Sequence, residues 1–241
     1  MPDHAAIYQH DAARYDRLVA REDKDGALPA ALAELIPPGA ATVVELGAGT
    51  GRVTLLLAPL AGRVLAFDAA APMLDVARER LADAGIAGRV TLAVAEHHAL
   101  PVPDQSADAV VAGWAIAHAV GWHPDGWRDR VDAALAEMAR VARPGAPQIV
   151  IETLGTGSAT LSPPPKLAPF YAHLEARGFG RRTIRTDYRF SSPDELAELI
   201  GFFFGAEVAA RFPAAREVPE YTGIWVRADG DAPRRGSGGV G

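Results

Sequence analysis

Three glycines at alternate positions form the most informative short motif of the chain. They belong to the run Glu45-Leu46-Gly47-Ala48-Gly49-Thr50-Gly51-Arg52. The run follows a short apolar segment and precedes a helical pattern, and glycines in such a turn let a ligand approach the backbone closely. A dinucleotide-binding turn needs its third glycine where Arg52 stands, so the spacing fits that fingerprint poorly. The turn therefore indicates a ligand site of another kind.

Two carboxylates accompany this turn. Glu45 lies at the end of the apolar segment, where an acid would repel a pyrophosphate but can hold an ammonium group, directly or through water. Asp68 comes 17 residues after Gly51, which is one helix plus one strand, and its carboxylate can accept hydrogen bonds from both hydroxyls of a ribose. A glycine turn with these two acids describes an adenosyl amino acid better than a dinucleotide.

Short apolar strands alternate with helical patterns around these residues. The strands are expected over 42–46, 63–67, 89–94, 107–112, 148–153, 183–190 and 220–227, and the helices over 5–20, 28–36, 52–60, 71–84, 127–141, 166–177 and 192–204. Buried strands separated by crossover helices are typical of a parallel sheet. One helix between the last two strands suggests an antiparallel addition at the edge. We therefore expect an α/β fold: a Rossmann-like, doubly wound, mostly parallel seven-stranded sheet with an antiparallel edge strand and helices on both faces.

The amino-acid composition excludes some kinds of site and some kinds of partner. The 241-residue chain is 49% hydrophobic, and 24 Lys and Arg against 30 Asp and Glu give a net charge of −6. A net acidic, globular composition predicts no nucleic-acid partner. The absence of cysteine excludes disulfides and thiolate sites. No metal-ligand spacing is recognisable among the histidines, so we expect no metal.

The N-terminal residues and the most apolar stretch bear on location. The chain begins Met1-Pro2-Asp3-His4, without a basic segment followed by an apolar one, so we expect no signal peptide and a cytoplasmic location. The apolar stretch 107–122 is shorter than the roughly 20 residues that span a bilayer. The sequence therefore predicts no membrane span.

Taken together, the motifs resemble those of the class I S-adenosylmethionine-dependent methyltransferases, close to the small-molecule group of the ubiquinone/menaquinone type. The resemblance covers roughly residues 8–152. Its motifs in chain order are Glu45-Leu46-Gly47-Ala48-Gly49-Thr50-Gly51, Phe67-Asp68 with Met73-Leu74, Glu96 before Leu100-Pro101-Val102-Pro103-Asp104, Asp108-Ala109-Val110-Val111, and Glu137-Met138-Ala139-Arg140-Val141-Ala142-Arg143-Pro144-Gly145. Five matches in the family's order are far more specific than a glycine turn alone.

The resemblance implies a site for S-adenosyl-L-methionine. The glycine turn would pass under the methionine and ribose, Glu45 would hold the methionine amino group, and Asp68 would hold the ribose hydroxyls. Glu96 would accept from the adenine amino group, where the family usually has an aspartate. The cofactor-binding residues implied are Tyr15, Glu45, Gly47, Ala48, Gly49, Gly51, Asp68, Ala69, Met73, Glu96 and His97.

The remaining implied roles follow the same pattern. Ala69 and Met73 would line the adenine face, His97 would supply a backbone amide, and Tyr15 would lie on a helix that covers the cofactor. The implied domains are N-terminal covering helices at 1–40 and a cofactor-binding domain at 41–227. Within that domain, 154–190 is a candidate substrate wall. Residues 228–241, rich in Gly, Asp, Arg and Ser, are expected to form a disordered tail.

Three residues are candidates on the acceptor side. His118 follows the fourth strand and is either a general base, because histidine titrates near neutral pH, or a hydrogen-bonded, half-buried histidine. Trp114 is either a wall of an apolar pocket or part of the core. Arg185, in an arginine-rich segment, either binds an anionic acceptor or lies on a solvated face.

The expected function is methyl transfer from S-adenosylmethionine to a small-molecule acceptor by in-line displacement. Two alternatives stay open. The first is a protein that binds S-adenosylmethionine without catalysis. The second is a nicotinamide-dependent oxidoreductase, which Arg52 and Glu45 disfavour.

Overall fold

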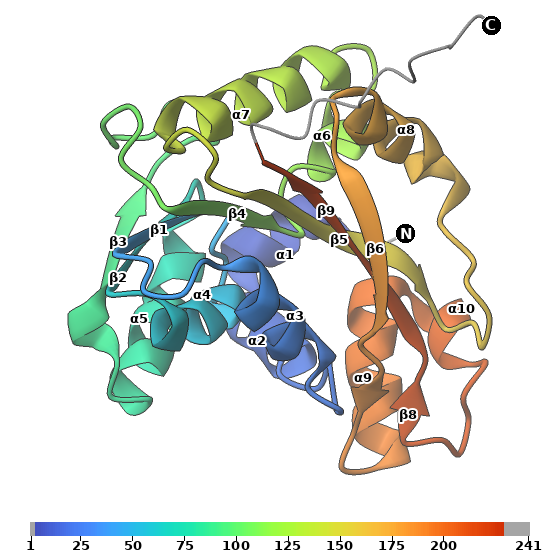
Figure 1. Ribbon diagram of the computed structural model, residues 1–241. Coiled ribbons are helices and arrows are strands. Elements are labelled where there is room, and N and C mark those ends of the chain that lie inside the picture. The colour runs from blue at the N-terminus through green and yellow to red at the C-terminus, as the bar shows by residue number, and fades with distance from the viewer. Residues whose placement is uncertain (1–2, 229–241) are drawn as a thin grey trace, which may run out of the picture.

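The computed structural model describes residues 3–228, so 229–241 of the expected tail lie outside the described residues. A seven-stranded sheet in the order β3-β2-β1-β4-β5-β9-β6 forms its centre (Figure 1). Its strands are β1 (Thr42–Leu46), β2 (Arg63–Asp68), β3 (Val90–Val94), β4 (Ala109–Gly113), β5 (Gln148–Thr156), β6 (Gly180–Arg185) and β9 (Glu220–Arg227). The first five strands are parallel, which confirms the doubly wound α/β fold.

The antiparallel strand lies one position in from the edge of the sheet. β9 pairs antiparallel with both β5 and β6, so β6 is the edge strand and runs in the same direction as β5. The expectation of an antiparallel strand is confirmed, but its place at the very edge was wrong. After β6 the chain leaves the sheet, and it returns as β9, which lies between β5 and β6.

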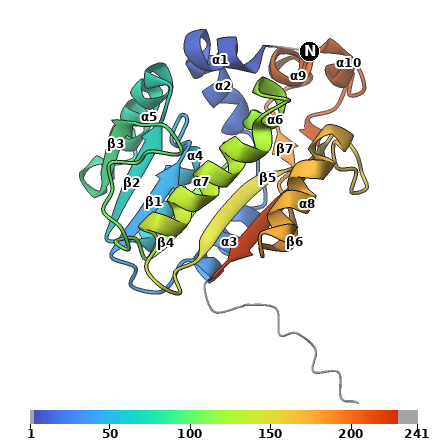
Figure 2. The same cartoon turned by 90° about the horizontal axis from the view of Figure 1, so that it is seen from above.

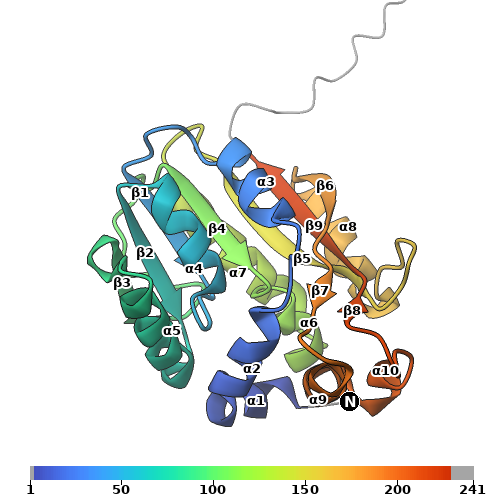
Figure 3. The ribbon, with the colours of Figure 1, turned by 90° about the horizontal axis from the view of Figure 1, so that it is seen from below.

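Helices cover both faces of the sheet, and the residues of the central strand β1 are therefore buried on both sides. Figure 2 shows α7 and α8 on one face, and Figure 3 shows α3, α4 and α5 on the other. Val44 belongs to the first of these cores and its neighbour Val43 to the second, as the alternation of a strand requires. The helices of the two faces are α3 (Ala27–Leu35), α4 (Arg52–Leu57), α5 (Ala71–Asp83), α6 (His118–Trp122), α7 (Trp127–Val141) and α8 (Ala168–Ala176), with short 3-10 turns η1 (Ala58–Leu60), η2 (Ala87–Arg89) and η3 (Pro165–Leu167).

Two short helices replace the single helix expected at 5–20. They are α1 (His4–His10) and α2 (Ala12–Val19), and Asp11 between them has φ −127°, outside helical geometry. Both pack against α5, and α2 also packs against α9 (Pro193–Phe204). They lie at the carboxyl end of the parallel strands (Figure 3). We call these two helices the N-terminal cover.

The strand expected at 183–190 is interrupted. β6 ends at Arg185, and β7 (Tyr188–Arg189) pairs instead with β8 (Glu217–Val218) in a separate two-stranded sheet. Thr186 lies between them, is buried, and has its hydroxyl 2.6 Å from that of Thr222 in β9. β7 and β8 join α9 and α10 (Ala206–Ala209) in a third core that includes Leu18 of the cover.

Candidate functional site

A cavity of about 370 Å³ lies at the carboxyl end of β1, β2 and β4, beneath the N-terminal cover. Its position is where open parallel sheets bind ligands. Twelve of the residues predicted from the sequence line it: Tyr15, Glu45, Gly47, Ala48, Gly49, Asp68, Ala69, Met73, Glu96, His97, Trp114 and His118. Gly51 and Arg185 are the two predicted site residues that are not among its lining.

The glycine turn adopts backbone geometry that only glycine takes without strain. Gly47, Gly49 and Gly51 have φ of +68°, +54° and +81°. A Cβ on Gly47 would lie 2.3 Å from the Cβ of Ala115, and one on Gly51 would lie 3.2 Å from that of Ala77. Gly51 therefore serves close packing against α5.

Asp68 holds this turn in place. Its Oδ2 accepts from the backbone N–H of Gly49 at 2.8 Å, and its Oδ1 accepts from that of Ala70 at 2.8 Å. The carboxylate thus bridges the loop after β1 and the loop after β2. Each oxygen keeps a further lone pair for a ligand hydroxyl.

Glu45 is a buried carboxyl group on the cavity wall, with 1% of its surface exposed. Thr54 donates its hydroxyl proton to Oε2 at 2.6 Å. Burial raises the pKa of Glu45 to about 8, and the nearby Asp68 adds to the effect. A cationic ligand group beside it would return this carboxyl to its charged form.

Arg52 lines the cavity but was not predicted as a site residue, because in the sequence it stands where a dinucleotide-binding turn has its third glycine. Its Nη1 donates to Oε2 of Glu22 at 2.7 Å, and its Cζ lies 4.1 Å from the ring centroid of Trp114. Trp114 itself has φ +49°, an uncommon geometry for a bulky residue. The cation follows the glycine turn directly, and that position was the signal that could have pointed to it.

His118 and Tyr8 meet at the other end of the cavity. The Oη of Tyr8 lies 3.2 Å from Nε2 of His118, and the His118 ring stacks on Trp122 with centroids 4.8 Å apart. Burial lowers the pKa of His118 to about 4, with further lowering from His4 and His97. The imidazole is therefore neutral near pH 7. Tyr8 was not predicted, since no pattern in α1 marks it.

Glu96 and His97 reach the cavity from the loop after β3. Burial lowers the pKa of His97, and its Nε2 lies close to Gly47. Glu96 is exposed at the rim. Between residues 3 and 228 no group of three or more potential metal ligands occurs.

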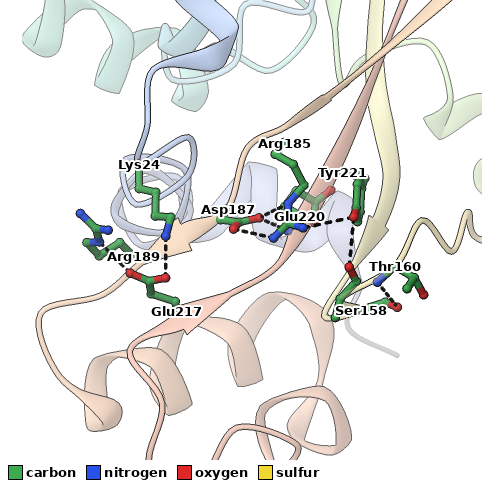
Figure 4. A network of polar contacts seen from close by, with 10 residues as sticks. Lys24, Ser158, Thr160, Arg185, Asp187, Arg189, Glu217, Glu220 and Tyr221 are labelled. Atoms are coloured by element: carbon green, nitrogen blue, oxygen red, sulfur yellow. Dashed lines mark hydrogen bonds and ion pairs between the residues drawn. The ribbon is translucent and has the colours of Figure 1, made fainter.

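Arg185 lies away from the cavity, in a surface network (Figure 4). Its guanidinium donates to both oxygens of Asp187, at 2.8 and 2.7 Å, and to the hydroxyl of Tyr221 at 3.1 Å. Tyr221 in turn donates to the carbonyl of Ala159 at 3.0 Å. The arginine thus fastens the loop after β5, and these contacts use the fork that an anionic acceptor would need.

The candidate substrate wall at 154–190 divides between core and surface. Phe170 and Leu174 of α8 are fully buried in the core against the sheet, whereas Leu161 in the preceding loop is 47% exposed.

No helix within the described part of the chain is long and apolar enough to cross a membrane.

Comparisons with known proteins agree with this geometry. Residues 44–150 match the methyltransferase domain family. The chain is 33% identical over 122 residues to the ubiquinone/menaquinone biosynthesis C-methyltransferase of Azotobacter vinelandii, covering 49% of this chain and 45% of that protein. It is 38% identical over 117 residues to the malonyl-[acyl-carrier protein] O-methyltransferase of Yersinia pestis, covering 48% and 38%. The matched segments thus span less than half the length of these relatives.

Solved structures extend the similarity of fold to nearly the whole chain. A phosphoethanolamine N-methyltransferase of Haemonchus contortus aligns with a TM-score of 0.60 and 18% identity over 93% of this chain and 58% of that one. The [4+2]-cyclase SpnF aligns with 0.57 and 19% over 93% of both chains. A methyltransferase of Aquifex aeolicus aligns with 0.55 and 17% over 90% and 97%. The family match over residues 44–150, the ordered motifs and the fold therefore make this chain similar to the class I, S-adenosylmethionine-dependent methyltransferases.

Proposed function

We propose that this protein transfers a methyl group from S-adenosylmethionine to a small-molecule acceptor. The observation that carries the proposal is the joint placement of Glu45, the glycine turn and Asp68 around one cavity of about 370 Å³. A cavity of this size suits a ligand as large as an adenosyl amino acid. The name of the Azotobacter relative, a methyltransferase of ubiquinone/menaquinone biosynthesis, supports this class of acceptor. The Yersinia relative is named for a malonyl group on an acyl-carrier protein.

The residues of the cavity fit the cofactor. Thr50 Oγ1 and Arg52 Nη2 are buried at the cavity without a hydrogen-bond partner among the described residues, which favours a polar ligand there. We assign the ribose hydroxyls to Asp68 and the methionine amino group to Glu45. The adenine-side assignments are those expected from the sequence: Ala69, Met73, Glu96 and His97.

The chain's own residues contribute positioning and shielding. S-adenosylmethionine supplies an electrophilic methyl group on a sulfonium. Transfer by in-line displacement needs an oriented acceptor and little water, and it requires no covalent protein residue. Tyr8 and Tyr15, 5.2 Å apart between ring centroids, line the cavity from the cover and exclude water there.

For an acceptor that carries a proton, we assign the role of base to His118. Its imidazole is neutral near pH 7, because burial lowers its pKa to about 4. With the hydrogen on Nδ1, Nε2 has a lone pair that can accept a proton, and the low pKa makes it a weak base. Tyr8 occupies that nitrogen at 3.2 Å and would exchange its contact with the acceptor. Trp114 also lines the cavity, whereas the contacts of Arg185 with Asp187 and Tyr221 do not favour a role in acceptor binding.

Location and partners complete the proposal. We assign the protein to the cytoplasm, without a nucleic-acid partner. The net charge of −6 supports the second part, because nucleic-acid binding rests on basic surfaces. Cell fractionation and a binding assay with duplex and single-stranded oligonucleotides test the two parts.

Calorimetric titration tests the cofactor first. S-adenosylmethionine and S-adenosylhomocysteine should both bind, NADH should not, and Asp68→Ala should weaken both adenosyl ligands. Binding of NADH in place of the adenosyl compounds would reverse the assignment in favour of an oxidoreductase. Tritium transfer from S-adenosyl-[methyl-³H]methionine to a panel of small acceptors then separates an enzyme from a binding protein, since the latter transfers no label to any of them.

A further inference from the structure

Glu152 is a buried carboxyl group in an otherwise apolar stretch of β5. It follows three fully buried aliphatic residues, and 4% of its own surface is exposed. It does not line the cavity. Burial raises its pKa to about 8, and the opposing influence comes from backbone hydrogen bonds and not from a cation. A buried carboxyl group is costly, so its presence here needs a reason that an aliphatic side chain would not supply.

The reason lies in the backbone of the loop after β4. Oε1 of Glu152 accepts from the N–H of Ala117 at 3.1 Å, and a hydrogen bond from the N–H of Ala115 also lowers its pKa. Neither N–H has a backbone acceptor among the described residues, and both alanines are buried. A carboxyl group has enough lone pairs to satisfy two such donors. Glu152 therefore holds this loop from the neighbouring strand.

The loop in question, residues 114–118, joins β4 to α6, and we call it the acceptor-side loop. It supplies Trp114 and His118 to the lining of the cavity. Trp114 has φ +49°, a conformation that a bulky residue keeps only where its surroundings impose it. The N–H of Trp114 donates to the carbonyl of Ile151 at 2.7 Å. Two adjacent residues of β5, Ile151 and Glu152, thus hold the loop in its strained conformation.

The same loop orients the imidazole of His118. Its Nε2 lies 3.2 Å from the hydroxyl of Tyr8. A hydrogen bond with the backbone of Trp114 raises the pKa of His118, against the larger effect of burial. A hydrogen bond that raises the pKa of a histidine has the ring N–H as its donor, so the partner is the carbonyl of Trp114. With Nε2 turned to Tyr8, this arrangement favours the tautomer that carries its hydrogen on Nδ1.

We propose that Glu152 is a positioning residue of the acceptor side: through Ala115 and Ala117 it holds the acceptor-side loop so that Nε2 of His118 presents its lone pair at the cavity. Glu152 touches neither cofactor nor acceptor. Its consequence for methyl transfer rests on the proposed function. Its effect on the imidazole belongs to the ligand-free protein and is measured without any substrate.

Nuclear magnetic resonance of the protein with ¹⁵N-labelled histidine rings tests the proposal. The chain has seven histidines, and the signals lost in His118→Gln identify those of His118. In the wild type, Nδ1 should be protonated and Nε2 should not. Glu152→Leu removes both acceptor oxygens and keeps much of the side-chain volume. It should replace the single tautomer by a mixture and raise the pKa of His118 towards its ordinary value of 6.5, because the freed loop admits water.

Glu152→Gln keeps the proposal testable if Glu152→Leu folds poorly. The amide has the shape of the carboxyl group and retains one acceptor oxygen, so it should change the ring signals of His118 in the same direction but less. Calorimetry on this variant should give a Kd for S-adenosylhomocysteine within about threefold of the wild type, since Glu45 and Asp68 keep their places. The effect is thus confined to the acceptor side.

Glu220 provides the matched control. It is a buried glutamate of the neighbouring strand β9, 2% exposed, and burial raises its pKa to about 8 as well. Its Oε1 accepts from the hydroxyl of Thr153 at 2.6 Å, a partner outside the acceptor-side loop. Glu220→Leu and Glu220→Gln should leave the ring signals of His118 unchanged, whatever they do to the stability of the fold.

The tritium-transfer screen adds a kinetic readout. With an acceptor whose proton His118 removes, Glu152→Gln should lower kcat roughly 10-fold or more, because a misplaced group of this kind is costly to the rate. The KM for S-adenosylmethionine should change little. A purely structural role would instead reduce the amount of folded enzyme and leave kcat per folded molecule as in the wild type.

Three results would overturn the proposal. The first is a wild-type His118 with its hydrogen on Nε2. The second is a folded Glu152 variant with the ring signals of the wild type, and the third is an equal change of those signals in the Glu220 variants. A wild-type protein that binds no adenosyl compound would contradict the proposed function instead, and the resonance experiment on the ligand-free protein distinguishes this failure from the others.

Discussion

The phenol oxygen of Tyr8 lies 3.2 Å from Nε2 of His118, although 110 positions separate the two residues in the chain. Tyr8 belongs to α1, and His118 begins α6 in the loop after β4. One polar contact therefore joins the N-terminal cover to the acceptor side of the cavity. If His118 acts as the proposed base, an acceptor has to replace Tyr8 at Nε2 or pass its proton through the Tyr8 hydroxyl.

The neutral His118 predicts a loss of stability in acid. Burial lowers its pKa to about 4 from an ordinary value of 6.5, so between these values the unfolded chain binds a proton that the folded chain does not. Stability should therefore fall as the pH decreases from 6.5 to 4. His118→Gln should reduce this fall by about 1–3 kcal/mol, measured by urea unfolding across that range. The same substitution at His10, which is exposed and does not line the cavity, is the control.

Glu45 predicts the opposite dependence, a loss of stability as the pH rises. Because burial raises its pKa to about 8, the ligand-free protein should lose stability as the pH rises from about 4.5 to 8. Glu45→Gln should make the ligand-free protein more stable at pH 8 by about 1–3 kcal/mol. A decrease in its melting temperature at that pH would contradict this account.

Ligand binding should ionise Glu45 and release a proton. If an ammonium group binds beside it, its pKa falls and the complex at pH 7 gives up to about one proton to the buffer. Titrations in buffers of different ionisation enthalpy measure this number. Glu152, whose pKa burial also raises to about 8, does not line the cavity, so Glu152→Gln should retain the release that Glu45→Gln abolishes.

Substitutions at two glycines of similar backbone geometry distinguish the cost of backbone strain from the cost of steric overlap. Gly51 has φ +81° and would place a Cβ 3.2 Å from that of Ala77, whereas Gly85 has φ +70° and no atom within 4 Å of the same position. Gly85→Ala should cost about 1–2 kcal/mol from the backbone alone. Gly51→Ala should cost more, about 2–4 kcal/mol, because α5 has to shift. Equal losses in chemical unfolding would argue against the packing role.

Arg185→Gln should leave the affinity for S-adenosylhomocysteine unchanged within about twofold. Its partners Asp187 and Tyr221 lie in the surface network and not in the cavity, and exposed ion pairs contribute little to stability. Calorimetry and thermal unfolding of the variant check both statements. A large increase in Kd would place Arg185 closer to the ligand than its contacts indicate.

The sequence predicted the fold and most of the lining of the cavity, because both depend on local patterns. Strand, glycine turn and helix are adjacent in the chain, and Asp68 follows at a spacing that one helix and one strand determine. The interruption at Thr186 was not predictable, since its partner Thr222 comes from a distant strand. The break at Asp11 was not predicted either.

The contacts missed at the site have the same origin. Tyr8 meets His118 and Glu22 meets Arg52 only after the cover has packed on the sheet. Neither pair has a periodicity or a motif that could mark it in the chain. Site residues within a single turn could therefore be predicted from the sequence, whereas contacts between residues of distant segments could not.

The bridge made by Asp68 has a consequence for the thermodynamics of binding. With Gly49 and Ala70 already donating to its two oxygens, the loops after β1 and β2 are ordered before any ligand arrives. Binding then carries no large loss of backbone entropy at these loops. The heat-capacity change should accordingly reflect the apolar surface that the adenine covers, without a contribution from coupled folding of the turn.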